Sequence, residues 1–437
     1  MKKLETGTRV VVEKQGRKYE GIVLPSNGFE DADTLVLKLD NGYNIGIKVD
    51  SKTKVTTLGK GERVGKAESK QEYAHSKQLE DIAVLSTGGT VASRIDYETG
   101  GVKAEFSAED LVASAPELKG IANIHSRLLF NLMSEDLTVE DWKQIASGVE
   151  KEVKAGRHGV IITHGTDTMH YSSAALSFML QGLGIPVVLT GAQRSSDRGS
   201  SDSFQNLACS ARMAVSNIAE VQLCMHGSSS DDYCHSHRGT RARKMHSSRR
   251  DAFQSINSKP LAKVWPDGKL EYLTKDYAKR GTESKLEVLD DFEERVGIVY
   301  AYPNMNPNVL EHYLDDGYKG IVIMGTGLGH VPTVNKKKSL IPLIKKASKD
   351  GVPVVVASQT INGRTHEFVY SNLRTLYQEA GAIPSQDMTP ETAYVKLMWV
   401  LGQTKDYEKA KALMLQNLRG EISPHTDHSS FKEQSLN

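Results

Sequence analysis

The pattern of hydrophobic and polar positions changes twice along the chain, and each pattern predicts a different kind of structure. The first 55 residues hold short, partly alternating apolar runs between turn formers, which predicts a small antiparallel β-barrel. Asn41-Gly42, between two of these runs, is a strong hairpin signal. A β-extension of the next domain is the alternative interpretation. The predicted strands are Thr8–Glu13, Tyr19–Leu24, Thr34–Leu39 and Tyr43–Val49.

The middle of the chain has a different pattern of hydrophobic and polar positions. After a polar, charged stretch (56–80) that we interpret as a linker, near-continuous apolar runs alternate with amphipathic stretches. Such runs are typical of strands covered on both faces, and their alternation with helices predicts a mostly parallel sheet between helices. The predicted strands are Ile82–Leu85, Gly159–Thr163, Pro186–Thr190 and Val221–Met225, and the predicted helices are Glu140–Ala155, Thr168–Leu183 and Ser203–Glu220.

The strand–helix pattern restarts near Glu294 and predicts a second, smaller α/β domain. One helix start is explicit, because Thr389 is a good N-cap and Pro390 occupies the first helical position. The fold class is therefore α/β, with a two-domain core behind a small SH3-like β-barrel. We divide the chain into a β-module (1–55), a linker (56–80), an α/β domain (81–275), a connector (276–293), a second α/β domain (294–420) and a polar tail (421–437).

Composition narrows the class of protein without indicating a function. Of the 437 residues, 55 are Lys or Arg and 54 are Asp or Glu, which argues against a chain that binds polyanions over its whole surface. No run approaches the roughly 18 apolar residues of a membrane span, and the N-terminus lacks an apolar signal segment. Three cysteines are too few for a disulfide framework. We expect a soluble cytoplasmic protein without membrane association.

The residues that follow each predicted strand are the candidates for chemistry, since ligands bind outside the carboxyl ends of strands in open α/β sheets. The segment Ser86–Ala92 contains two glycines, which permit a tight turn and a close approach of a ligand to the backbone. It leaves the hydroxyls of Thr87 and Thr90 near the strand end. A turn that only begins a helix is the alternative, and the Gly-Lys-[Ser/Thr] ending of a phosphate loop is absent.

A second candidate follows the predicted strand Gly159–Thr163. Thr166 and Asp167 lie where this strand gives way to a helix, so they are either functional groups or ordinary helix caps. His164 and His170 flank them, but two histidines six positions apart are more often structural than metal-binding. We predict no metal site.

The third candidate is a basic segment, residues 238–250, with six cations and no acid in thirteen residues. A solvated or RNA-facing loop is the simpler interpretation. The sharper one is that a lysine held among other cations loses its proton readily and serves as a base. Just upstream, Cys234, His235 and His237 together with His226 imitate a zinc ligand set, but their spacing fits no standard structural zinc pattern.

These three loops could combine into one mechanism if the fold brings them together. A threonine hydroxyl would attack a carbonyl carbon, and a base supported by a Lys–Asp pair would remove a proton. Backbone N–H groups of the glycine turn would hold the resulting oxyanion. The pattern alone predicts the parts of this mechanism and leaves open whether they meet in space.

Two of the segments carry the paired signatures of a family. Ser86–Ala92 followed by His164–Met169 strongly resembles the two motifs of bacterial-type L-asparaginases. The similarity continues through Pro186–Ala192 and Gly320–Gly327 to Asp387–Thr392, and it covers about three quarters of the chain. The resemblance implies a flavodoxin-like N-terminal domain, a smaller C-terminal α/β domain and an active site at their junction and at a subunit interface. It also implies hydrolysis of an amide to an acid and ammonia without a cofactor.

The resemblance also implies roles for individual residues. The first-motif Thr is the nucleophile and the others form its supporting triad: Thr90, then Thr166, Asp167 and Lys244. Arg241 and Arg243 are the nearest alternatives to the lysine. The family usually carries a Tyr about thirteen residues after the nucleophile, where this chain has Lys103, and Tyr97 is the nearest phenol. The identity of a Tyr partner for the nucleophile is therefore open.

The substrate segment departs from the family as well. The family commonly reads Ser-Gln-Asp, whereas this chain has Ser134-Glu135-Asp136. By resemblance, Ser134 holds the substrate carboxylate and Gly89 of the glycine turn contacts the substrate. Glu135 indicates an altered pocket, suited to a longer substrate.

The β-module ahead of this core resembles the D subunits of archaeal glutamyl-tRNA(Gln) amidotransferases. That resemblance implies a glutaminase whose ammonia passes to a partner E subunit, which uses ATP and Mg²⁺ to convert Glu-tRNA(Gln) to Gln-tRNA(Gln). It implies no cofactor in this chain, contact with Glu-tRNA(Gln) mainly through the partner, and a homodimeric core within a heterotetramer. Whether residues 1–55 touch tRNA or the partner is open.

Two other functions compete with this interpretation. A free-standing L-asparaginase or glutaminase would turn over free amide without a partner. A non-catalytic RNA-binding or assembly protein on the same scaffold would have lost a catalytic residue, and none of the four is missing.

Overall fold

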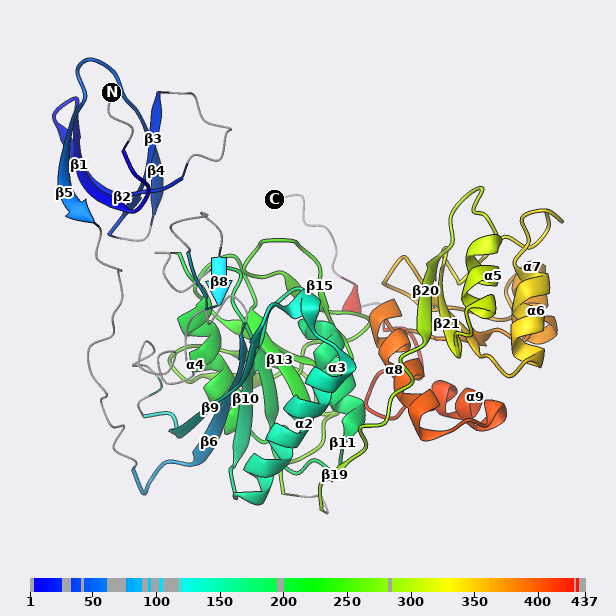
Figure 1. The fold of residues 1–437 in the computed structure, drawn as a ribbon. Helices are drawn as coiled ribbons and strands as arrows, with labels where there is room; N and C mark the ends of the chain where they lie inside the picture. Colours follow the sequence, from blue (N-terminus) through cyan, green and yellow to red (C-terminus); the bar gives the residue numbers. More distant parts are fainter. Residues whose placement is uncertain are drawn as a thin grey trace.

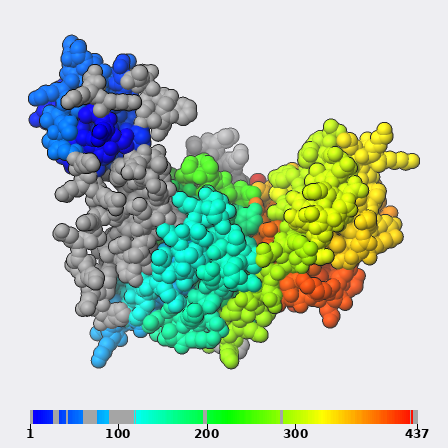
Figure 2. Space-filling model, in the orientation of Figure 1, coloured from blue at the N-terminus to red at the C-terminus, as the bar shows by residue number. Residues whose placement is uncertain are grey.

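The computed structural model describes residues 4–25, 33–40, 43–60, 76–88, 93–95, 102–104, 118, 120–194, 200–281, 285–427 and 430–431, with backbone alone for 93–95 and 102–104. It contains a small β-module and a larger core of two α/β domains (Figure 1). Figure 2 shows the two core domains side by side, the C-terminal one in yellow and orange. Within the part of the chain that the structure describes, no helix has both the length and the apolar character to cross a membrane.

The front module is a five-stranded antiparallel sheet in the order β4-β3-β2-β1-β5. Its strands enclose a small core formed by Val10, Val12, Val23, Leu37 and Ile47. The last strand extends the module to Lys60, beyond its predicted end at residue 55, and the predicted Asn41-Gly42 turn lies outside the described residues. The strands are β1 (Thr8–Lys14), β2 (Arg17–Val23), β3 (Thr34–Leu39), β4 (Asn44–Lys48) and β5 (Lys54–Lys60).

The first core domain is built on an eight-stranded sheet in the order β18-β17-β14-β13-β12-β10-β6-β9. The five strands from β13 to β9 are parallel, as the near-continuous apolar runs predict, and the other three join antiparallel. The strands are β6 (Asp81–Gly88), β9 (Asn123–Leu132), β10 (Gly159–Thr163), β12 (Val187–Thr190), β13 (Val221–His226), β14 (Cys234–Arg238), β17 (Ala262–Val264) and β18 (Leu270–Tyr272).

Helices cover both faces of this sheet, which is why the central parallel strands β10 and β12 are buried along their whole length. Ala83 and Leu85 of β6 pack in one core cluster with residues of α2 and α3, whereas Ile82 and Val84 pack in another with residues of α4. The helices are α2 (Val139–Lys154), α3 (Met169–Met179) and α4 (Ser203–Ala214), preceded by the 3₁₀ turn η3 (Ser134–Asp136).

Three two-stranded ribbons complete this domain. The predicted helix Thr168–Leu183 ends early because Leu180 and Gln181 form a strand that pairs with residues 287–288. The ribbons are β7 (Ser93–Ile95) with β8 (Val102–Ala104), β11 (Leu180–Gln181) with β19 (Glu287–Val288), and β15 (Ala242–Lys244) with β16 (Phe253–Ser255).

The second core domain has a four-stranded parallel sheet, β20-β21-β22-β23. Its helix α8 packs against α3 of the first domain, so the two domains share one hydrophobic core. The predicted start of α8 is confirmed, because Pro390 is its first residue and the Thr389 side chain accepts a hydrogen bond from Thr392 N. The elements are β20 (Val296–Tyr300), α5 (Asn308–Asp315), β21 (Gly320–Gly325), α6 (Ile341–Lys349), β22 (Val354–Ser358), α7 (Ser371–Arg374), η4 (Thr375–Glu379), β23 (Ile383–Pro384), α8 (Pro390–Gln403) and α9 (Tyr407–Leu415).

The segment after α9 differs from the polar tail predicted from residue 421. Glu421 is fully buried and forms an ion pair of 2.6 Å with the equally buried Lys396 of α8. Its carboxylate also accepts hydrogen bonds from the backbone N–H groups of Leu418 and Arg419. A charged tail residue is buried here because an opposite charge and backbone donors satisfy it.

Candidate active site

The candidate site lies at the carboxyl edge of the first sheet. Strands β6 and β10 are parallel neighbours, and Ser86 of β6 pairs with Thr163, the last residue of β10. The two predicted catalytic loops therefore leave the sheet side by side. Gly88 ends β6 with φ +102°, and a Cβ on it would lie 2.6 Å from the Leu132 carbonyl oxygen of β9, so only glycine fits this position.

The nucleophile loop is described as far as Gly88. Gly89 and Thr90, the predicted substrate contact and nucleophile, lie outside the described residues, as do Tyr97 and the side chain of Lys103. The other candidate hydroxyl of this loop has a structural partner. Thr87 Oγ1 is buried and donates to the Thr163 carbonyl at 2.9 Å, which ties β6 to β10.

The structure brings three of the predicted catalytic residues together. Lys244 Nζ lies 2.9 Å from Thr166 Oγ1 and 2.5 Å from Asp167 Oδ1. Thr166 is buried, whereas the Asp167 side chain is 66% exposed, so the group opens to solvent on the carboxylate side. An amine at this distance from a hydroxyl can exchange a proton with it, and the carboxylate fixes the amine's position. The lysine comes from β15, which belongs to a ribbon rather than to the main sheet.

The predicted substrate residue Ser134 packs against the loop that carries Thr166 and Asp167. Ser134 is buried at the start of η3, and a Cβ on Gly165 would lie 2.7 Å from its Cβ, so glycine allows the two loops to pack closely. Thr168 Oγ1 donates to the Ser134 carbonyl at 2.7 Å. Glu135 occupies an exposed position. Gly165 and Thr168 were not predicted as positioning residues, although both belong to the second motif.

The basic segment 238–250 is electrically compensated within the protein. Each of its six cations forms an ion pair with a carboxylate, so the segment does not present six free charges to RNA. The pairs are Arg238 with Glu220, Arg241 with Asp387, Arg243 with Glu391, Lys244 with Asp167, Arg249 with Asp251, and Arg250 with Asp231. Arg241 and Arg243, the alternatives to the lysine, bind acids of the second domain instead of Thr166 or Asp167.

The histidines of the second motif have structural surroundings. The His164 ring is fully buried, with Nδ1 2.6 Å from the Gly165 carbonyl and Nε2 2.8 Å from Ser172 Oγ. Burial lowers the pKa of His164 to about 4. Burial likewise lowers the pKa of His170 to about 4, so both rings are neutral at neutral pH.

The residues that imitate a zinc ligand set do not converge. Cys234 and His235 are consecutive in β14 and therefore point to opposite faces of the sheet. The His237 ring lies 2.8 Å from Ser255 Oγ through Nδ1. Among the described residues, no three His, Cys, Asp or Glu side chains are grouped to hold a metal ion.

Comparison with known protein families covers nearly the whole chain. Residues 81–277 match the family model "Asparaginase, N-terminal", and residues 295–414 match "Glutaminase/Asparaginase C-terminal domain". Residues 4–58 match "GatD N-terminal domain". The three models follow the same order as the front module and the two core domains.

Individual relatives give the same result. The chain is 51% identical over 434 residues to the D subunit of glutamyl-tRNA(Gln) amidotransferase from Pyrococcus furiosus, covering 98% of each protein. It is 50% identical to that of Methanothermobacter thermautotrophicus, covering 98% of this chain and 96% of the relative. The thermostable L-asparaginase of Thermococcus kodakarensis superimposes with a TM-score of 0.70 at 32% identity, over 79% of this chain and 100% of that one. The chain thus belongs to the asparaginase family, among the D subunits of glutamyl-tRNA(Gln) amidotransferases.

Proposed function

We propose that this chain hydrolyses glutamine with Thr90 as nucleophile and supplies ammonia to a partner subunit. The observation that carries the chemistry is the contact of Lys244 with Thr166 and Asp167, beside the strand that leads to Thr90. A hydroxyl, an amine and a carboxylate in hydrogen-bond reach provide the base and its support. The near-full-length likeness to D subunits supports glutamine as the substrate.

The reaction follows two balanced steps. Thr90 Oγ attacks the side-chain amide carbon, and its proton passes by way of Thr166 to the Lys244 amine. The lysine then gives this proton to the amide nitrogen as the C–N bond breaks, which releases ammonia and leaves an ester on Thr90. Water then attacks the ester and gives up a proton to the same base. The base returns that proton to Thr90 Oγ as the C–O bond breaks, which releases glutamate and the free threonine. In both steps, backbone N–H groups of the glycine turn would stabilise the negative oxygen.

Substrate binding rests on the loop between β9 and α2. Ser134 lies buried against Gly165, next to the catalytic group, and would hold the substrate carboxylate. Glu135 occupies the position of the family's Gln and would reshape the pocket for the longer glutamine side chain. Gly89 would contact the substrate from the nucleophile loop.

The assembly follows from the same family likeness. We propose that an E-type subunit uses ATP and Mg²⁺ to activate Glu-tRNA(Gln), receives the ammonia and makes most of the tRNA contacts. This chain would form a homodimer within a heterotetramer, in the cytoplasm. Exposed apolar side chains of the second core domain, at and just beyond the end of β20 and just before α7, support a contact surface on that domain. They are Tyr300, Tyr302, Phe368, Val369 and Tyr370.

A free-standing L-asparaginase or glutaminase is the second candidate. Its supporting observation is that solved L-asparaginases superimpose on the two-domain core without the front module. The third class, a non-catalytic RNA-binding or assembly protein, loses support because the cations of the segment 238–250 are paired internally.

One set of assays separates these candidates. Glutamine and asparagine hydrolysis is measured with and without the partner and charged tRNA, in the wild type, in Thr90→Ala and in a variant that lacks residues 1–60. A chain that acts as a D subunit transfers glutamine nitrogen to Glu-tRNA(Gln) only with its partner, and the deletion weakens this transfer while sparing hydrolysis. Rapid turnover of free asparagine that ignores the partner would favour the second candidate, and activity of Thr90→Ala would move the nucleophile to Thr166.

A further inference from the structure

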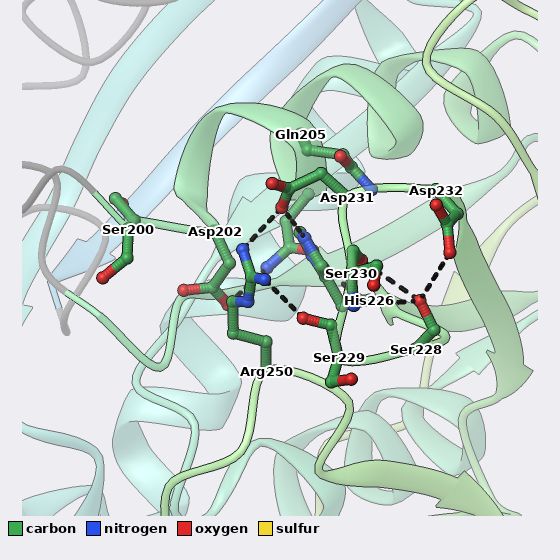
Figure 3. A network of polar contacts seen from close by, with 12 residues as sticks. Ser200, Asp202, Gln205, His226, Ser228, Ser229, Ser230, Asp231, Asp232 and Arg250 are labelled. Carbon is green, nitrogen blue, oxygen red and sulfur yellow. Dashed lines mark hydrogen bonds and ion pairs between the residues drawn. The ribbon is translucent and has the colours of Figure 1, made fainter.

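The turn that follows Lys244 is held to the rest of the domain by a polar network (Figure 3). β15 and β16 pair over three positions, with Lys244 opposite Phe253. Met245 N donates to the Ala252 carbonyl at 2.7 Å and closes the turn. A ribbon this short is marginal by itself, so contacts at its end help to decide where the lysine points.

Arg250 provides such a contact. Its guanidinium lies 2.5 Å from Asp231 Oδ1 in the β13–β14 loop and also donates to the Ser229 carbonyl in that loop. The Arg250 side chain is only 17% exposed, although it belongs to a surface turn. Two acceptors in one neighbouring loop make it an anchor rather than a free surface charge.

The buried ring of His226 contacts Asp231. Asn206 Oδ1 accepts the backbone N–H of His226 at 3.0 Å and lies 2.6 Å from Nδ1, while Asn206 Nδ2 donates to the Gly191 carbonyl. Nδ1 must therefore carry the proton. Nε2 of the same ring lies 3.2 Å from Asp231 Oδ1, and burial lowers the pKa of His226.

The same network continues to the neighbouring strand. The Asp202 carboxylate accepts hydrogen bonds from the backbone N–H groups of Gln193 and Arg194, beyond the end of β12, and from Asn206 Nδ2. Asp202 and Asn206 are fully buried. The turn is thus connected, through Arg250, Asp231, His226 and Asn206, to the buried carboxylate of Asp202.

We propose that Arg250 is a positioning residue for Lys244 and acts through its ion pair with Asp231. The pair fixes the far end of the ribbon, and the ribbon then holds the amine against Thr166. This inference rests on the proposed role of Lys244 in amide hydrolysis. A small displacement of a catalytic group is enough to lower the rate by one or two orders of magnitude.

Arg249 is a matched control in the same turn. It is a neighbouring arginine with a carboxylate partner, but that partner is Asp251, two residues away in the same turn. Its side chain is 53% exposed. Removing Arg249 changes the net charge as removing Arg250 does, without releasing the turn from the β13–β14 loop.

The experiment measures glutamine hydrolysis of the full chain in five variants: Arg250→Ala, Arg250→Lys, Asp231→Ala, Arg250→Ala with Asp231→Ala, and Arg249→Ala. We expect kcat to fall about tenfold or more for Arg250→Ala, with KM within about twofold, because the turn carries none of the substrate residues. Arg250→Lys should recover part of the loss. The double variant should lose no more than Arg250→Ala alone, since both changes break one interaction.

Equal kcat in Arg250→Ala and Arg249→Ala would overturn the proposal, as would losses that multiply in the double variant. If Arg250→Ala does not fold, Asp231→Asn, which keeps the shape of the side chain, decides the question by the same criterion. Hydrogen exchange of the amides in residues 242–255 gives a readout without activity. Hydrogen exchange should become faster in Arg250→Ala and not in Arg249→Ala, and unchanged exchange in Arg250→Ala would contradict the proposal. A wild type that hydrolyses no amide refutes the proposed function instead, and the exchange result still stands.

Discussion

The basic segment 238–250 and the front module are both rich in cations, and they place them differently. In the segment, Arg241 and its partner Asp387 are 2% and 3% exposed, and Glu391, the partner of Arg243, is 8% exposed. In the module, Arg9 pairs with Glu20 and Asp40, whose side chains are 46% and 56% exposed. Ion pairs with similar distances therefore stand in different dielectric surroundings.

That difference decides what the loss of one charge costs. Water stabilises an exposed carboxylate after its partner is gone, so surface pairs contribute little. A buried carboxylate without its partner has neither water nor counter-charge, and its desolvation cost is then uncompensated. Substitutions in the two regions should therefore differ sharply, and in the segment each cation should have its own effect.

The largest effect is expected for Lys244→Arg. The variant keeps the positive charge and the ion pair with Asp167, but a guanidinium does not supply a neutral amine. We expect kcat for glutamine hydrolysis to fall about 10²–10⁴-fold, nearly as far as in Lys244→Ala. Arg249→Lys, the reverse exchange in the same segment, is the control and should change kcat less than about twofold. Wild-type activity of Lys244→Arg would rule out a base role.

The next effect concerns stability. Arg241→Met leaves Asp387 buried and also removes hydrogen bonds to the Gly420 carbonyl and Ser423 Oγ. We expect the free energy of unfolding to fall by about 3–5 kcal/mol, measured by urea denaturation. The double variant Arg241→Met with Asp387→Leu should recover most of this loss, because it removes the unpaired charge. A single variant that loses less than about 1 kcal/mol would contradict the argument.

Buried histidines around the site predict a pH dependence. Burial lowers the pKa of His164 and His170 to about 4, against about 6.5 in the unfolded chain. Above pH 6.5 both states are neutral. Below pH 6.5 the two histidines bind protons in the unfolded chain but stay neutral in the folded protein. The free energy of unfolding therefore falls as the pH falls from about 6.5 to about 4.

At pH 5 each of the two histidines should account for about 2 kcal/mol of lost stability. His170→Gln tests the contribution of one of the two histidines. The Nδ1 atom of His170 has no hydrogen-bond partner among the described residues, so the substitution breaks no hydrogen bond of that atom. We expect the difference in free energy of unfolding between pH 7.5 and pH 5 to shrink in this variant. The lowered pKa values of Asp81 and Glu293 act below about pH 4.5 and do not disturb the comparison. If the free energy of unfolding of this variant depended on pH as strongly as that of the wild type, the lowered pKa of His170 would be refuted.

Local sequence patterns predicted those strands and helix ends whose structure depends on residues close by in the chain. β10 has the predicted bounds, because a strand covered on both faces reads as an unbroken apolar run. The N-cap at Thr389 is likewise determined by its own neighbours. Parallel pairing places the carboxyl ends of neighbouring strands at one sheet edge, so the proximity of the ends of β6 and β10 was predictable.

Elements whose structure depends on residues far away in the sequence could not be predicted in this way. β14 has a polar sequence, yet Ser236 is buried because it donates to Gln222 of β13. β9 lies at an edge of the sheet and carries His125 and Arg127, so it lacks an apolar run. The acids that compensate Arg241 and Arg243 lie 146 and 148 residues away in the chain, and no local window contains both charges of such a pair.

The smallest effect is expected in the front module. Arg9→Met removes a cation that contacts Glu20 at 2.9 Å and Asp40 at 2.6 Å, but both carboxylates remain hydrated after the change. We expect the free energy of unfolding of the module to change by less than about 1 kcal/mol and glutamine hydrolysis to stay at the wild-type level. Leu37→Ala in the same module is the matched control, because this fully buried side chain leaves a cavity and should cost about 2–5 kcal/mol. If Arg9→Met destabilised the module as much as Leu37→Ala, exposure would not explain the contrast between the two regions, and the module's ion pairs would have to be shielded by a bound partner.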